Sequence, residues 1–119
     1  MLIVYDSKTG NVKRFVARLD LPAVPVEEDA VLEEPFVLVT HTTGFGQVPP
    51  RSAAFLARNG GFLRGVAASG NRNWGENFAR SADRIAAAYG VPVLHKFELS
   101  GTAADVETFC ERVVRLAAH

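Results

Sequence analysis

Short apolar runs recur along this chain, separated by stretches in which the apolar residues are spaced differently. Runs at residues 2–5, 36–39, 62–68 and 91–99 have the length and composition of buried strands. A further run at residues 22–26 contains two prolines, which cannot donate hydrogen bonds to a central ladder. The pattern therefore predicts five strands, with the proline-containing one at an edge of the sheet.

Apolar residues at helical spacing follow three of these runs and predict helices over residues 12–19, 78–89 and 102–116. Pro49-Pro50 suits the first turn of another helix, the second along the chain, which runs to about Arg58. The triplet at residues 59–61 is expected to close the second helix, and Gly90 the third. Thr102 followed by Asp105 matches a capping box at the start of the fourth.

The alternation of strand and helix is typical of a doubly wound α/β domain with a parallel sheet. Five strands with four helices imply the strand order 2-1-3-4-5 with helices on both faces, and residues 1–119 suit a single domain. In such sheets ligands bind at the carboxyl ends of the strands, where the order reverses between strands one and three. We therefore expect the loops after strands one, three and four to form one pocket.

The charge balance indicates which partners are disfavoured, and the cysteine count indicates the cellular compartment. Thirteen Lys and Arg residues balance thirteen Asp and Glu residues, so no net field favours nucleic acid or an anionic membrane. The only cysteine is Cys110, and the apolar run at the N-terminus is too short for a signal peptide or a membrane span. We expect a cytoplasmic protein without disulfides, and the dispersed His41, His95 and His119 predict no metal site.

The loop after the first strand combines hydroxyl, amide and backbone donors at the start of a helix. Its residues suit a phosphate, and the helix dipole favours an anion there; they are Ser7, Lys8, Thr9, Gly10 and Asn11. The spacing matches neither the phosphate loop of nucleoside triphosphatases nor the Gly-x-Gly-x-x-Gly of dinucleotide-binding proteins. A capped turn from strand to helix would use the same residues, so this loop alone leaves both interpretations open.

The loop after the third strand contains two glycines, which allow its backbone to approach a flat ligand closely and to change conformation. It consists of Thr42, Thr43, Gly44, Phe45 and Gly46. A flexible surface loop would explain the same glycines equally well.

The only tryptophan, Trp74, lies in the polar loop that follows the fourth strand. Its place between Asn73 and Gly75 suits stacking on a flat aromatic ligand, with Phe45 as a candidate second wall. The amides of Asn71 and Asn73 would suit the polar edge of such a ligand. The plain alternative is that Trp74 only packs against the edge of the domain.

Four segments together resemble the NrdI family, flavodoxin-like flavoproteins that serve class Ib ribonucleotide reductase. The segments are DSKTGNV at 6–12, TTGFG at 42–46, GNRNWG at 70–75 and KFELSGT at 96–102. Residues 96–102 are candidates for the rim of the pocket or for a partner surface. The resemblance runs in order over essentially the whole chain. It implies a flavodoxin-like fold and an FMN cofactor, with the phosphate in the first loop and the ring between the other two. The implied cofactor-binding residues are Ser7, Lys8, Thr9, Gly10, Asn11, Val12, Thr42, Thr43, Gly44, Phe45, Gly46, Ser69, Asn71, Asn73, Trp74 and Gly75.

The resemblance also implies partners and a reaction. Family members dock on the radical-bearing small subunit of the reductase, where reduced FMN reacts with molecular oxygen. The resulting superoxide or peroxide oxidises the dimanganese site. The protein would then be a maturation factor rather than a metabolic enzyme, recharged by an unidentified flavin-reducing protein. Gly44 and Phe45 would lie next to flavin N5, where the peptide beside Gly44 could flip to present its carbonyl to the reduced ring.

Several features depart from ordinary flavodoxins. Asn11 stands where those proteins usually have a hydroxyl, and the flavin loops are short. The chain is neutral overall and has Arg72 in a flavin loop, so two-electron reduction should be easier than beside a strongly acidic surface. His41 occupies a position where an aromatic residue such as tyrosine is expected.

Three alternatives differ in chemistry. A flavodoxin-type electron-transfer shuttle would share these loops and differ in redox behaviour and partner. A response regulator has the same strand order and would use positions near Asp6, Ser69 and Lys96, but strand three ends without the aspartate that accepts phosphate. The third alternative is a non-redox module that binds a phosphorylated small molecule.

Overall fold

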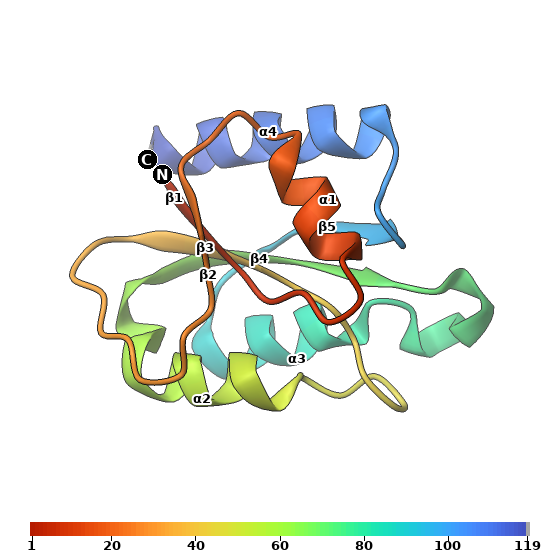
Figure 1. The fold of residues 1–119 in the computed structure, drawn as a ribbon, viewed down its shortest axis with the longest axis horizontal. Coiled ribbons are helices and arrows are strands. Elements are labelled where there is room, and N and C mark those ends of the chain that lie inside the picture. The colour runs from red at the N-terminus through yellow and green to blue at the C-terminus, as the bar shows by residue number, and fades with distance from the viewer. Residues whose placement is uncertain (119) are drawn as a thin grey trace.

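A computed structural model describes residues 1–118, so His119 lies outside the described residues. Its five strands are β1 Leu2–Tyr5, β2 Ala23–Pro25, β3 Phe36–Thr40, β4 Leu63–Gly70 and β5 Val93–Glu98. They form one sheet in the order β2-β1-β3-β4-β5, and every neighbouring pair is parallel (Figure 1). The predicted doubly wound fold is confirmed, with the proline-containing strand at an edge.

Helices cover both faces of this sheet. Figure 1 shows α1 Asn11–Ala17 and α4 Ala103–Ala117 on one face, and α2 Pro50–Asn59 and α3 Arg80–Tyr89 on the other. Two short 3-10 helices flank β4, η1 Gly60–Phe62 before it and η2 Arg72–Asn77 after it. Within residues 1–118, none of the helices is both long enough and apolar enough to cross a membrane.

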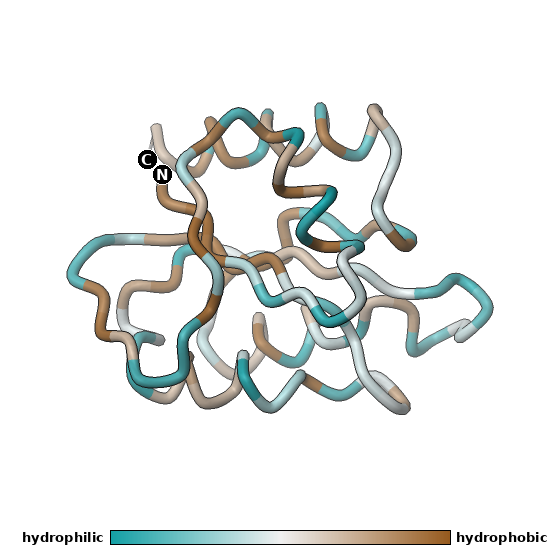
Figure 2. The backbone as a smooth tube through the Cα atoms, in the orientation of Figure 1, coloured by the Kyte–Doolittle hydropathy of each residue, from teal (hydrophilic) through white to brown (hydrophobic). Residues whose placement is uncertain are grey.

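The sheet separates two hydrophobic layers. β3 is buried at every position, as expected for a central strand covered on both faces. Beneath α1 and α4, the Phe15 ring stacks on Phe97 with centroids 3.9 Å apart, and Phe109 meets Phe15 edge to face at 5.6 Å. On the other face, Phe36 and Phe55 form an edge-to-face pair at 5.5 Å. Figure 2 accordingly shows hydrophobic colouring along the strands and hydrophilic colouring on many outer turns.

Two strand boundaries differ from the prediction by two residues, and the others by no more than one. β4 extends to Gly70, so Ser69 and Gly70 belong to the strand rather than to the loop. β5 begins at Val93 rather than Val91, because Pro92 has no N–H and the Val91 N–H donates to the Ala86 carbonyl at the end of α3. The polar loop after β4 is therefore shorter than predicted.

The helix ends follow local signals in most cases. Gly90 closes α3 in the left-handed conformation with φ 66°, as predicted. The predicted capping box of α4 is present, with Thr102 and Asp105 each accepting the other's backbone N–H. Gly60 is right-handed, however, so the chain passes from α2 into η1 instead of stopping there. α3 begins only at Arg80, because Ala79 has φ 49°.

Candidate functional site

A cavity of about 340 Å³ lies at the carboxyl ends of β1, β3 and β4, where the strand order reverses. Its volume falls in the range of small-molecule sites. The lining residues come from four connections and from the adjoining ends of α1 and β4; they are Ser7, Lys8, Thr9, Asn11, Val12, His41, Thr42, Thr43, Gly44, Ser69, Gly70, Asn71, Trp74 and Leu99. The three loops that the topology predicted to converge do meet at one place.

Five of the predicted site residues do not line this cavity: Gly10, Phe45, Gly46, Asn73 and Gly75. The three glycines among them have positive φ and shape the turns that carry the lining residues. Phe45 is 81% exposed, and its place as a second wall for the ligand stays a prediction.

Ser7 and Asn11 are held in place within the β1–α1 connection. The Ser7 hydroxyl accepts the Lys13 N–H at 3.2 Å. The Asn11 Oδ1 accepts the Arg14 Nη2 at 2.6 Å and the Ser100 hydroxyl at 2.8 Å. These contacts leave the Asn11 amide nitrogen directed toward Thr9, 3.4 Å from its Oγ1. Hydroxyl and amide donors are thus concentrated in one short loop at the cavity wall.

The β3–α2 connection forms a tight turn at the cavity. Thr43 and Gln47 exchange backbone hydrogen bonds at 3.1 and 2.8 Å, and the Gly46 N–H donates to the Thr43 carbonyl. The Thr42 hydroxyl shares a hydrogen bond of 2.9 Å with Ser81 of α3, which anchors the loop to that helix. Gly44 has φ 51°, a left-handed conformation that favours glycine. A Cβ there would come within 2.0 Å of the Gln47 side-chain oxygen, which lies at the end of a flexible side chain.

The β4–α3 connection presents Trp74 to the cavity. The Trp74 N–H donates to the Asn71 carbonyl at 3.0 Å, and the Asn71 side chain accepts the Asn73 N–H at 2.9 Å. The Trp74 side chain has 42% of its surface exposed, so one face is available for a ligand. The Arg72 guanidinium lies over the Phe78 ring at 4.6 Å, and Arg72 is not among the lining residues. Arg72 thus lies in the predicted loop after β4 but outside the cavity wall.

A fourth connection, between β5 and α4, contributes Leu99. Its φ is 53°, its N–H donates to the Gly70 carbonyl at 3.1 Å, and its carbonyl accepts the Ser69 hydroxyl at 2.6 Å. Half of Leu99 is exposed, which places an apolar surface at the cavity. Sequence analysis expected residues 96–102 at the rim of the pocket or at a partner surface but singled out no residue among them, because a single leucine carries no local signal.

A buried carboxylate, that of Asp6, directly follows β1 and lies next to His41 of the cavity wall. The Asp6 Oδ2 accepts the Ser52 hydroxyl at 2.8 Å, and Ser52 shares a hydrogen bond of 2.8 Å with Thr40. The Asp6 Oδ1 lies 3.6 Å from the His41 Nε2. Burial tends to raise the pKa of the Asp6 carboxyl, but the neighbouring His41 and Ser52 outweigh it and hold the pKa below its usual range.

The sequence pattern of the family described as NrdI flavodoxin-like matches residues 3–111. The chain belongs to the NrdI family. It is 56% identical to the protein NrdI of Bacillus licheniformis over 115 residues, covering 96% of this chain and 88% of that one. It is 41% identical to the SPbeta prophage-derived protein NrdI of Bacillus subtilis over 121 residues, covering 98% and 94% of the two chains. NrdI proteins are flavoproteins linked to ribonucleotide reductase.

The fold also resembles a solved flavodoxin. A short-chain flavodoxin associated with a bacterial microcompartment has a TM-score of 0.73 and 20% identity, covering 98% of this chain and 95% of that one. At this identity the likeness supports the flavodoxin-like fold of this chain.

The response-regulator alternative would require Lys96 at the pocket. In the structure the Lys96 ammonium instead pairs with the Asp83 carboxylate at 2.5 Å.

Proposed function

We propose that this protein binds FMN in the cavity at the carboxyl ends of β1, β3 and β4. The bound FMN, once reduced, would give electrons to molecular oxygen and so supply superoxide or peroxide for assembling the dimanganese-tyrosyl radical cofactor of class Ib ribonucleotide reductase. The observation that carries the proposal is the meeting of four connections of a NrdI-family chain around one cavity. Cytoplasmic location and recharging by a separate flavin-reducing protein belong to the same proposal.

The donor set of the cavity suits the two chemically different parts of FMN. Ser7, Thr9 and Asn11 offer hydroxyl and amide groups for the phosphate. Trp74 and Leu99 offer partly exposed apolar surface for a flat ring, and aromatic stacking adds to the area buried. The polar groups lie after β1, and the apolar groups lie after β4 and β5. This arrangement suits an elongated ligand with a charged end.

The Gly44 turn provides a means of responding to the redox state of the ring. The hydrogen bonds that close this turn are made by Thr43, Gly46 and Gln47. Rotation of the Gly44–Phe45 peptide would leave those bonds intact, and glycine tolerates the required backbone conformations. In our proposal this peptide presents its carbonyl to flavin N5 when the ring carries a proton there.

Exposed apolar side chains near the cavity favour contact with a partner protein. Phe45 is 81% exposed and Leu99 52% exposed, and both belong to connections that border the cavity. Such residues at a surface are typical of protein interaction sites. We propose the radical-bearing small subunit of the reductase as the partner, with oxygen reaching the ring at this junction.

The alternative is an electron-transfer shuttle of the flavodoxin type. Anaerobic reduction of the FMN-loaded protein, followed by mixing with oxygen, separates the two functions. We expect full reduction to proceed without a long-lived one-electron-reduced form, followed by rapid reoxidation. A one-electron-reduced form stable over a wide range of potential and slow to reoxidise would instead support the shuttle.

Direct activation is the second part of this test. The reduced protein, the manganese-loaded small subunit and oxygen should together yield the tyrosyl radical, detected by electron paramagnetic resonance. Omission of this protein is the matched control. Equal radical yield with and without it would contradict the proposed function.

A further inference from the structure

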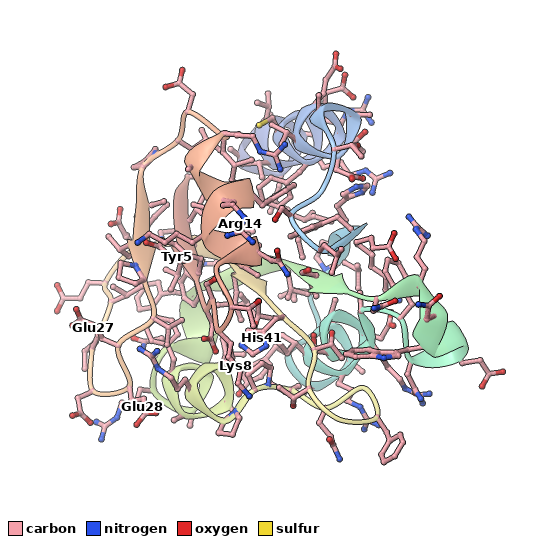
Figure 3. All side chains as sticks on the ribbon, turned by 45° about the vertical axis from the view of Figure 1, so that its right-hand side comes forward. Tyr5, Lys8, Arg14, Glu27, Glu28 and His41 are labelled. Carbon is pink, nitrogen blue, oxygen red and sulfur yellow. The ribbon has the colours of Figure 1, made fainter. Side chains whose placement is uncertain are left out.

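Arg14 of α1 does not line the cavity, but it holds a residue that does. Its Nη2 donates to the Oδ1 of Asn11 at 2.6 Å, and its Nε donates to the Ser100 hydroxyl at 3.1 Å. The Ser100 hydroxyl in turn donates to the same Asn11 oxygen at 2.8 Å. Figure 3 shows Arg14 on α1, above Lys8 and His41 of the cavity wall. The Asn11 oxygen thus accepts two hydrogen bonds from residues outside the wall.

The chemistry of arginine fixes the direction of these hydrogen bonds. A guanidinium carries donors only, so the Asn11 atom that faces Arg14 must be the amide oxygen. Because the Ser100 oxygen accepts the Arg14 Nε, the Ser100 proton is free to be donated to Asn11. The Asn11 nitrogen is directed toward Thr9 instead, and its one hydrogen bond within residues 1–118 goes to Thr9 Oγ1 at 3.4 Å. A second N–H of Asn11 is therefore left for a ligand.

An asparagine at an anion site has to be held in one orientation. Its amide has a donor end and an acceptor end, and the acceptor end repels a phosphate. The hydroxyls of Ser7 and Thr9 in the same loop can rotate their protons, whereas an amide has to turn over as a whole. If the Asn11 amide turned over, its N–H groups would face the donors of Arg14 and Ser100. These two donors therefore keep the nitrogen end on the side of the loop.

Local and tertiary structure together form this network. Asn11 and Arg14 are three positions apart on one helix, so their side chains are neighbours. A Cβ at Gly10 would lie 2.9 Å from the Arg14 Nη1, so the absence of a side chain there leaves room for the guanidinium. Ser100 comes from the β5–α4 connection, 86 positions after Arg14. The complete network exists only when α1 and this connection are packed together.

We propose that Arg14 is a positioning residue that, together with Ser100, holds the Asn11 N–H groups toward the cavity and thereby favours a phosphorylated ligand. The inference rests on the proposed function in taking FMN as that ligand. Arg14 acts through Asn11 rather than by touching the ligand, because it lies outside the cavity wall. Loss of Arg14 should therefore weaken recognition of the phosphate and leave recognition of the ring unchanged.

The test compares the dissociation constants of FMN and riboflavin, measured by quenching of flavin fluorescence. Riboflavin has the same ring and side chain but lacks the phosphate. We expect Arg14→Met to lower the affinity for FMN about threefold to tenfold, as for loss of one hydrogen bond, and to leave the affinity for riboflavin unchanged. Arg14 is exposed, so the variant should fold, and far-UV circular dichroism checks this. Equal losses for the two flavins would overturn the inference.

Arg18→Met is the matched control. Arg18 lies one turn after Arg14, is also exposed, and donates to the carbonyls of Ser100 and Gly101 rather than to Asn11. Its replacement removes a positive charge and a contact with the same connection but leaves the support of Asn11 intact. This variant should keep the ratio of FMN to riboflavin affinity of the unmodified protein. A change of ratio as large as that in Arg14→Met would overturn the inference.

A double variant shows whether Arg14 acts through Asn11. Asn11→Ala removes the amide, so adding Arg14→Met to it should lower the FMN affinity no further. Direct attraction between the Arg14 charge and the phosphate would instead persist in that background. An undiminished effect of Arg14→Met in the Asn11→Ala protein would therefore overturn the inference.

A final readout needs no flavin. NMR relaxation of the Asn11 side-chain N–H groups should show greater mobility in Arg14→Met than in the unmodified protein, because the amide loses a fixed hydrogen bond. Arg18→Met should leave this mobility unchanged. An Asn11 amide equally rigid in Arg14→Met would overturn the inference. Failure of the unmodified protein to bind either flavin would overturn the proposed function instead.

Discussion

At the scale of single residues, Trp74 offers the broadest flat surface at the cavity. Its loop is held by the hydrogen bonds of Asn71 with the N–H groups of Asn73 and Trp74, so the indole is positioned by local backbone structure. The side chain is 42% exposed, which means that its removal leaves little cavity in the core. A change at this position should therefore affect ligand binding far more than folding.

Replacement of Trp74 by Ala should weaken FMN binding about tenfold to a hundredfold, equivalent to about 1–3 kcal/mol of lost burial and stacking. The measurement is the dissociation constant from fluorescence quenching, together with the flavin absorption spectrum. Trp74→Phe keeps an aromatic face and should retain most of the affinity. Unchanged binding in Trp74→Ala would contradict stacking on this residue.

Sequence analysis identified Trp74 and the hydroxyl-rich first loop because each carries a recognisable local composition. It placed Phe45 at the ligand as well, yet Phe45 is 81% exposed and outside the cavity. The direction of a side chain in a glycine-flanked turn depends on φ at Gly44 and Gly46, which neighbouring residues do not determine. Sequence analysis placed residues 96–102 at the rim or at a partner surface without singling out Leu99, whose left-handed backbone is held by hydrogen bonds to β4.

At the scale of elements, the end of β4 brings the sheet, the cavity and the start of α3 into close contact. Gly70 lines the cavity, and a Cβ there would lie 2.5 Å from the Ala79 backbone nitrogen. Ala79 is buried and precedes α3 with φ 49°. The atoms that an added Cβ would meet first belong to the backbone, so no flexible side chain can turn aside to make room for it.

Gly70→Ala should destabilise the protein by about 1–3 kcal/mol through overpacking and should also weaken FMN binding. Chemical denaturation with urea measures the first effect, and FMN titration the second. Gly61→Ala is the matched control, because a Cβ there meets nothing within 4 Å. That variant should change stability by no more than about 1 kcal/mol. Equal stability of the two variants would show that the β4–α3 junction adapts to the added methyl group.

Element boundaries were predicted well where a short-range signal sets them. Gly90 and the Thr102–Asp105 box end and begin helices where expected, since each acts within one turn of chain. The extension of β4 to Gly70 was not predicted, because it follows from pairing with β5 rather than from composition. Long-range pairing overrides the polar character of Ser69.

At the scale of the whole molecule, two aspartates stabilise the two helical layers. Asp6 joins β1 to α2 through Ser52, and Asp105 joins the start of α4 to His95 of β5 at 2.7 Å. Burial tends to raise the pKa of Asp105 as it does that of Asp6. For Asp105, the hydrogen bonds from Thr102 and the contact with His95 outweigh the effect of burial. The pKa of both carboxyls therefore lies below the usual 3.8.

Acid should therefore destabilise the FMN-free protein in a defined range. A carboxyl whose pKa is lower in the folded than in the unfolded protein stabilises the folded state. This contribution is complete above the unfolded pKa, near 3.8 for aspartate, and it is lost as the pH falls through the folded pKa. Urea denaturation at pH 6, 4 and 3 should show a fall in unfolding free energy mainly below pH 4. Asp6→Asn should be less stable at pH 6 and lose less on acidification. An Asp6→Asn variant with an undiminished acid response would show that Asp6 makes no such contribution.

The sequence by itself determined the alternation of strands and helices, the order 2-1-3-4-5 and the edge at which three polar loops meet. These follow from periodicity, helix caps and the handedness of parallel crossovers, all of which are local or topological. Only the tertiary structure decided that Leu99 enters the cavity and that Asp6 is buried against Ser52 and His41. Such contacts join residues that are distant in the sequence; Asp6 and Ser52 are 46 positions apart. Their geometry depends on how the packed helices and the sheet fit together.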